Sequence, residues 1–175
     1  MTNVNERLSF GWSLYQSGNA AQAEQVFRET LQEAPDNADA WCILGIICRG
    51  QGHSADAMAC YQEALRLKPD FVEGFNNLGN ALVDLGRYGE AVGCYQQALQ
   101  RNPNYPQAHN NMGAALRHQG KFEEAVACYR RALELSPDYA DAHNNLGDAY
   151  KALEKQINQL SPALAEILAQ ANSSP

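Results

Sequence analysis

This 175-residue sequence lacks the patterns of membrane-spanning and nucleic-acid-binding proteins. A membrane-spanning helix needs about 18 or more consecutive apolar residues, and the sequence has no such run. Lys and Arg number 13 against 20 Asp and Glu, which gives a formal net charge of −7. Nucleic-acid surfaces need clustered basic residues, so we expect no nucleic acid and no membrane as partner. The polar segment Met1–Phe10 differs from a secretory signal, and we expect a cytoplasmic location.

Sequence patterns of catalytic and metal sites are missing as well. The motifs HExxH and GxxxxGK and the nucleophile elbow do not occur. Cys42 and Cys48 form no CxxC pair, and Cys60, Cys94 and Cys128 recur 34 residues apart. We interpret these cysteines as core-filling thiols in a reducing compartment. The sequence therefore predicts no enzyme activity, no catalytic residue, no metal and no cofactor.

The chain does contain an internal repeat with a period of 34 residues. A ring-bearing residue begins each copy, and Leu or Met, Gly, a second Gly, Ala, Tyr, Ala and Pro follow at constant offsets. The recurring residues are Trp41, Phe75 and His109; Leu44, Leu78 and Met112; Gly45, Gly79 and Gly113; Gly52, Gly86 and Gly120; Ala57, Ala91 and Ala125; Tyr61, Tyr95 and Tyr129; Ala64, Ala98 and Ala132; Pro69, Pro103 and Pro137. A weaker copy runs from Phe10 to Pro35, and half a copy runs from His143 to Tyr150.

Each copy has the pattern of two amphipathic helices. Phe75, Leu78 and Leu82 lie three or four residues apart, which places them on one helical face. Gly86 ends this helix, and Pro103 ends the next because proline cannot continue the hydrogen-bond ladder. One such hairpin cannot bury its apolar face alone, so neighbouring copies must stack.

The repeat resembles the tetratricopeptide repeat (TPR) family, which has the same period and the same order of aromatic, Leu-Gly, Tyr, Ala and Pro positions. The resemblance implies an all-α fold, a right-handed α-solenoid of stacked antiparallel helix pairs with a C-terminal capping helix. We expect a single array over residues 1–175, with repeats at about 4–37, 38–71, 72–105 and 106–139 and a partial repeat and capping helix at 140–171. Ser161 and Pro162 are the predicted N-cap and first residue of that last helix.

One position opposite the predicted core carries asparagine in three repeats, as Asn77, Asn111 and Asn145. Asparagine is an unfavourable residue in the middle of a helix. Stacked repeats lie about 10 Å apart, so such a row could hold the backbone of an extended chain at every third residue. This row is similar to the asparagines in the repeat arrays of O-linked N-acetylglucosamine transferases. Ser9 and Ile43 depart from it in the first two repeats, and descent from one ancestral repeat is the alternative explanation. The predicted peptide-binding groove comprises Asn76, Asn77, Asn80, Asn110, Asn111, Asn144 and Asn145.

A second candidate surface is apolar. Leu8, Trp12, Ile43 and Ile46 fall on the predicted groove face of the first two repeats. Exposed apolar groups of this kind usually mark an interaction surface. The alternative is that the N-terminal helix covers them.

Three functions are compatible with these patterns. The first is a protein–protein interaction module that binds an extended peptide or partner protein in its groove. The second is the substrate-recognition region of a glycosyltransferase-like enzyme whose catalytic domain is absent from this sequence. The third is a scaffold that self-associates into a homo-oligomer through the apolar patch. The identity of the partner is not encoded in any motif.

Overall fold

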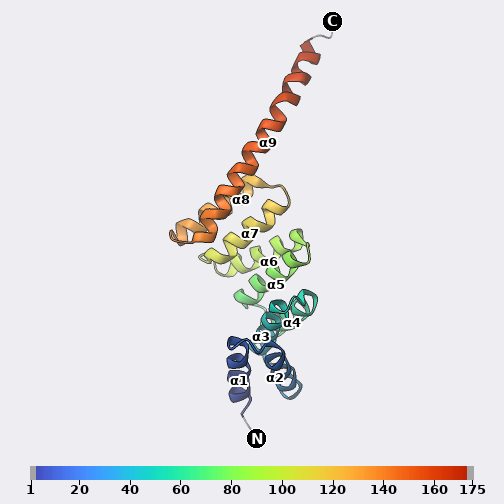
Figure 1. Ribbon diagram of the computed structural model, residues 1–175, viewed down its shortest axis with the longest axis vertical. Coiled ribbons are helices and arrows are strands. Elements are labelled where there is room, and N and C mark those ends of the chain that lie inside the picture. Colours follow the sequence, from blue (N-terminus) through green and yellow to red (C-terminus); the bar gives the residue numbers. More distant parts are fainter. Residues whose placement is uncertain (1–2, 173–175) are drawn as a thin grey trace. The chain divides into compact units, whose positions relative to one another are not determined.

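The computed structural model describes residues 3–172, with side chains as far as residue 159, and this range forms nine helices (Figure 1). The chain divides into two compact units, Met1–Asn104 and Tyr105–Pro175. Unit 1 contains α1 (Val4–Gln16), α2 (Ala20–Glu33), α3 (Ala38–Gly50), α4 (Ser54–Leu67), α5 (Val72–Asp84) and α6 (Tyr88–Arg101). Unit 2 contains α7 (Pro106–His118), α8 (Phe122–Leu135) and α9 (Ala140–Asn172). The fold is an all-α solenoid of helix pairs.

Four glycines create the sharp turn inside each helix pair. Gly18, Gly52, Gly86 and Gly120 have φ between 72° and 86°, a left-handed conformation that costs glycine little because it has no Cβ. Each turn allows the second helix to pack back on the first, so α1 packs on α2, α3 on α4, α5 on α6 and α7 on α8. Within unit 1, α2 also packs on α3 and α4 on α5, which stacks the pairs.

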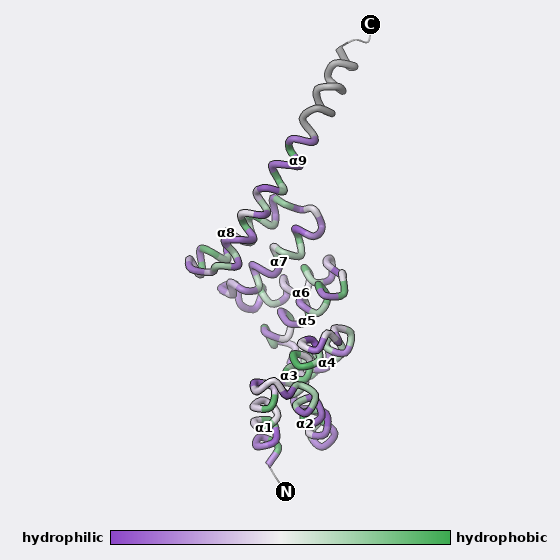
Figure 2. The backbone as a smooth tube through the Cα atoms, viewed as in Figure 1, coloured by the Kyte–Doolittle hydropathy of each residue, from purple (hydrophilic) through white to green (hydrophobic). Residues whose placement is uncertain are grey.

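The core of each pair is built from small residues and one large ring. Ala57, Ala91 and Ala125 are fully buried, as are the rings of Tyr61 and Tyr95. Small side chains allow the two helices to approach closely, and the tyrosine ring fills the remaining space. Apolar and polar residues alternate along the helices, and α3 is the most apolar stretch of the tube (Figure 2).

The half repeat at the C-terminal end departs from the hairpin pattern. Glu154 stands where the earlier repeats have the turn glycine, and α9 continues through it as one helix to Asn172. A residue with a Cβ disfavours the left-handed turn, so the helix goes on. The prediction of a separate helix beginning at Ser161 and Pro162 is wrong, because α9 includes both residues. The capping contact expected of that segment lies outside the described side chains.

Candidate functional site

A cavity of about 540 Å³ opens on one face of unit 1. We call this the inner face, defined as the face formed by the first helices of the repeats, α1, α3 and α5. Its lining combines aromatic, aliphatic, amide and charged groups, namely Tyr15, Ile46, Arg49, Gly50, Tyr61, Asn77 and Asp84. Such a mixture of apolar surface and a few convergent polar groups is typical of a binding site.

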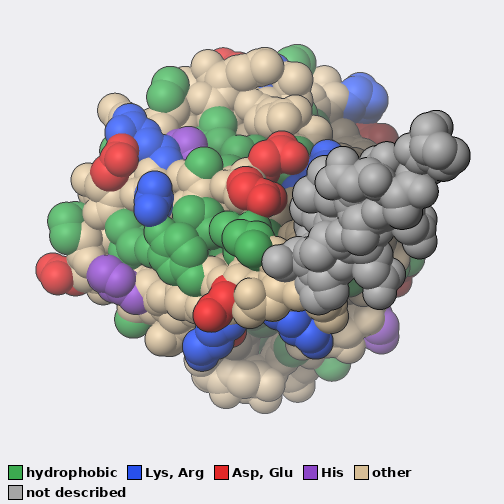
Figure 3. All heavy atoms as spheres, turned by 90° about the horizontal axis from the view of Figure 1, so that it is seen from above, with side chains coloured by type: hydrophobic (Ala, Val, Ile, Leu, Met, Phe, Trp, Pro, Cys, Tyr) green, Lys and Arg blue, Asp and Glu red, His purple; other side chains and the backbone are tan. Residues whose placement is uncertain are grey.

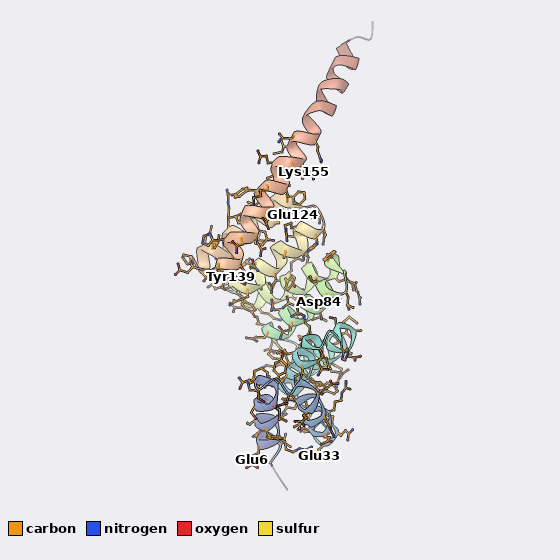
Figure 4. The ribbon with its side chains drawn as sticks, in the orientation of Figure 1. Glu6, Glu33, Asp84, Glu124, Tyr139 and Lys155 are labelled. Atoms are coloured by element: carbon orange, nitrogen blue, oxygen red, sulfur yellow. The ribbon has the colours of Figure 1, made fainter. Side chains whose placement is uncertain are left out.

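An ion pair crosses the cavity from α3 to α5. Nε of Arg49 lies 2.6 Å from Oδ2 of Asp84, and Nη2 lies 3.3 Å from Oδ1, so the guanidinium holds the carboxylate with two bonds. The hydroxyl of Ser54 donates a third bond, of 3.3 Å, to Oδ2. The hydrogen bond to Asp84 raises the pKa of Arg49. Asp84, which Figure 4 labels, is the last residue of α5 and pairs with Arg49 of the preceding repeat.

Asn77 lies in the same cavity and also connects two repeats. Its Nδ2 lies 3.5 Å from Sγ of Cys42, 35 residues earlier. The same 35-residue step recurs in unit 2, where Nδ2 of Asn145 donates a 3.0 Å bond to Oδ1 of Asn110. Asn77 and Asn145 therefore each connect two adjacent repeats through an amide N–H group.

The remaining predicted groove asparagines differ in exposure. Asn76 and Asn110 are buried, at 5% and 6% exposure, and Nδ2 of Asn110 donates a 3.4 Å bond to Oδ1 of Asn111. Asn80 accepts a 2.8 Å bond from the hydroxyl of Tyr95 in its own repeat. Asn144 is exposed, and Asn77, Asn80, Asn111 and Asn145 are half-buried. Unit 1 contains Asn76, Asn77 and Asn80. Unit 2 contains Asn110, Asn111, Asn144 and Asn145.

The predicted apolar patch lies on the two neighbouring first helices α1 and α3. Leu8, Trp12, Ile43 and Ile46 are all half-buried, and Ile46 lines the cavity. The indole of Trp12 contacts the ring of Tyr15 at 5.5 Å between centroids. The patch therefore continues into the cavity through Ile46 and Tyr15.

Sequence reasoning missed four residues of the cavity, namely Tyr15, Arg49, Gly50 and Tyr61. Tyr61 was recognised only as a repeat core residue. The 35-residue spacing of Arg49 and Asp84 was the available signal, since opposite charges one repeat plus one residue apart face each other in this fold.

Cysteine, histidine and tryptophan side chains do not line this cavity. The structure contains no cluster of three or more metal-binding side chains within its described residues, and all five cysteines are free thiols. His143 serves the packing of repeats, because its Nε2 lies 2.7 Å from the carbonyl oxygen of Pro137. The Nε1–H group of Trp41 likewise donates a 2.8 Å hydrogen bond to the carbonyl oxygen of Pro35.

Two features describe the surface more generally. Acidic and basic side chains lie interspersed on the face that Figure 3 shows. Within the part of the chain that the structure describes, no helix has the length and apolar character needed to cross a membrane.

Three sequence models of one repeat family match the chain. Models described as "Tetratricopeptide repeat" match residues 8–70 and 60–93, and a model described as "TPR repeat" matches residues 79–117 and 115–153. Together they extend from residue 8 to residue 153. No curated protein sequence matches the chain at a significant level.

Solved structures with a similar fold include a structure titled "Crystal structure of MamA protein". It has 19% identity and a TM-score of 0.78, and the match covers 98% of this chain and 96% of that one. A second, "MamA AMB-1 P212121", has 25% identity and a TM-score of 0.71 over 77% of this chain and 80% of that one. A third, "Crystal structure of APC/C hetero-tetramer Cut9-Hcn1", has 20% identity and a TM-score of 0.78. That match covers 85% of this chain and 30% of the other.

Proposed function

The chain belongs to the tetratricopeptide repeat family, and on that premise we propose that it is a protein-interaction module whose inner face in unit 1 binds an extended segment of a partner polypeptide. The observation that carries this proposal is the cavity between α1, α3 and α5, in which Ile46, Tyr15 and Asn77 meet. One of the similar structures is titled as a hetero-tetramer of Cut9 with Hcn1, which is in keeping with a role in assembling proteins.

The lining residues supply the two kinds of contact that an extended peptide needs. Ile46 and Tyr15 offer apolar surface for one side chain of the ligand, and burial of such a group contributes about 1.5–3 kcal/mol. Asn77 uses its N–H group toward Cys42, and its carbonyl oxygen can accept a hydrogen bond from a backbone N–H of the ligand. A contact to the backbone selects no side chain, so the apolar contact determines specificity.

A peptide selection followed by titration tests this proposal. Peptides chosen from a random displayed library against the full chain are titrated into the parent and into the Ile46→Ser, Asn77→Ala variant. Loss of one hydrogen bond and part of an apolar contact should weaken binding by roughly 10- to 1000-fold. The control variant, Gln62→Ala with Gln96→Ala, changes exposed residues of the second helices α4 and α6 and should bind like the parent. Equal affinities of parent and test variant would remove the proposal.

Self-association is the second candidate, and Phe10 favours it. Phe10 occupies the repeat position of Leu44 and Leu78, which are 1% and 8% exposed, yet Phe10 is 57% exposed. A second copy that covered this ring would extend the stack and gain about 25 cal/mol for each Å² of apolar surface buried. Phe10→Ser should then shift the mass measured by light scattering towards the monomer. A mass that is independent of concentration in the parent would exclude this candidate.

A further inference from the structure

Two successive repeats of unit 1 hold their core tyrosines in the same way but give the hydroxyls different surroundings. A Cβ placed on the glycine sixteen residues before Tyr61 or Tyr95 would lie 2.5 Å from Cε1 of that ring, so the two rings occupy equivalent positions. The hydroxyl of Tyr95 donates a 2.8 Å bond to Asn80. The residue 34 positions before Asn80 is Ile46. An aliphatic side chain cannot accept a hydrogen bond, so Tyr61 lacks the partner that Tyr95 has.

The hydroxyl of Tyr61 is directed at the cavity of unit 1. Tyr61 and Ile46 both line this cavity, although Tyr61 is only 1% exposed. Because the hydroxyl of Tyr95 reaches the residue at the position of Ile46, the hydroxyl is the part of Tyr61 that meets the cavity. Burial raises the pKa of the Tyr61 phenol, so the group keeps its proton and acts as a donor. A donor this deeply buried is unfavourable without an acceptor, and it therefore favours a ligand atom that accepts a hydrogen bond.

The charged groups of the cavity balance each other. Arg49 and Asp84 are its charged lining residues, and they form one ion pair. A charged ligand group would lose its water there and find no uncompensated opposite charge, which is unfavourable. The carboxylate of Asp84 accepts two hydrogen bonds from Arg49 and one from Ser54. A carboxylate has about four acceptor positions, so one is left for an N–H group of a ligand without charge.

Apolar surface adjoins these polar groups. Ile46 and Tyr15 line the same cavity from α3 and α1. A Cβ on Gly50 would lie 2.9 Å from the hydroxyl of Tyr15, so this side chain extends to the end of α3. A matching side chain needs an aliphatic stem and an uncharged end group that both accepts and donates hydrogen bonds. Glutamine combines two methylene groups with such an amide.

We propose that the cavity of unit 1 is a binding site for a glutamine side chain of the partner polypeptide. The methylene groups of this glutamine contact Ile46 and Tyr15. Its carbonyl oxygen accepts a hydrogen bond from Tyr61, and its amide N–H group donates one to Asp84. The inference rests on the proposed function for the polypeptide that carries the glutamine, and it adds the side chain that the cavity selects.

A capped alanine pentapeptide with glutamine at its centre is the probe for this site. It is titrated into the ¹⁵N-labelled full chain, and the backbone amide resonance of Gly50, which lines the cavity, is followed. Two matched peptides carry methionine or glutamate instead. We expect a saturable shift with the glutamine peptide and roughly 5- to 100-fold weaker binding of the methionine peptide, which makes neither hydrogen bond. The glutamate peptide should also bind more weakly, because its carboxylate is repelled by Asp84. No saturable shift with glutamine, or equal affinities of the three peptides, would overturn the proposal.

Tyr61→Phe tests the donor without changing the packing of the ring. Phenylalanine fits this position, since Phe27 is fully buried at the same place in the first repeat. The variant should bind the glutamine peptide roughly 2- to 10-fold more weakly and the methionine peptide as the parent does. Tyr95→Phe is the matched control, because its hydroxyl is bonded to Asn80 and neither residue lines the cavity. Equal losses in the two variants would show that the Tyr61 hydroxyl has no specific role and would overturn the assignment.

Two further substitutions change the partners of the amide. Ile46→Asn supplies Tyr61 with the acceptor that the next repeat has, and it should remove the preference for glutamine over methionine. Asp84→Asn leaves the charge of Arg49 uncompensated, so the glutamate peptide should then bind more tightly than the glutamine peptide. An unchanged ranking of the peptides in both variants would contradict the proposed contacts.

Failure of this proposal is distinct from failure of the proposed function. If selected peptides lose affinity in the Ile46→Ser, Asn77→Ala variant but the alanine peptides show no preference for glutamine, the proposed function stands and the glutamine site is wrong. If the alanine peptides rank as expected but selected peptides bind that variant like the parent, the glutamine site stands and the proposed function fails.

Discussion

Close approach of a glycine to a tyrosine ring recurs in three successive repeats. A Cβ placed on Gly45, Gly79 or Gly113 would lie 2.5–2.7 Å from Cε1 of the tyrosine sixteen residues later. Real carbon contacts are longer, so any side chain at these positions must displace the ring or separate the helices. Gly147 has the same place in the half repeat, and a Cβ there would meet nothing within 4 Å because α9 forms no hairpin.

Two glycines of unit 1 should therefore respond to alanine with opposite signs. Gly79→Ala forces its Cβ against the ring of Tyr95 and should lower the free energy of unfolding by about 1–3 kcal/mol. Gly93→Ala, in the middle of α6 with open space around it, should raise that energy by about 0.5–1 kcal/mol because alanine is the better helix former. Urea denaturation of both variants measures the difference. Changes of the same sign would contradict the packing described for the helix pair.

Helix beginnings differ in how their free N–H groups are satisfied. The side chain of Asn37 accepts a 2.9 Å bond from the N–H of Ala40 at the start of α3. Asn3 forms a capping box with Glu6 at the start of α1. The N-cap residues of α4, α6 and α8 make no such bond with their side chains. Both capped helices are first helices of repeats in unit 1 and contribute to the inner face, and so does α5, whose N-cap residue Phe71 makes no such bond.

The cap of α3 should contribute measurably to stability. Asn37→Ala removes the bond to Ala40 and should lower the free energy of unfolding by about 1 kcal/mol. Lys121→Ala is the control, since Lys121 is the N-cap of α8 and makes no capping bond; it should change stability by less than about 0.5 kcal/mol. Thermal or chemical unfolding followed by circular dichroism distinguishes the two. Equal losses would show that the cap of α3 contributes nothing specific.

Across the whole molecule, the 34-residue period predicts the helix pairs because each repeated residue has one steric role. The turn glycines predict the turns. The replacement of the turn glycine by Glu154 agrees with the long α9, whereas Ser161 and Pro162 predict a new helix that does not begin there. The site was less predictable. A single-helix wheel places Asn77 and Asn80 opposite the core, but contacts to the preceding repeat and to Tyr95 leave both half-buried. Such contacts depend on how neighbouring repeats stack, and the periodicity of one helix carries no information about that stacking.

The central claim is that unit 1 binds a polypeptide on its inner face, and photo-crosslinking tests it most directly. A benzoylphenylalanine is placed at Ile46 in the cavity or at Gln96, an exposed residue of α6, in the otherwise unchanged chain. Each protein is irradiated with a labelled form of a selected peptide, and the labelled adduct is measured by mass spectrometry. We predict an adduct from position 46 that excess unlabelled peptide removes, and background alone from position 96. An adduct from position 96 with none from position 46 would contradict the claim.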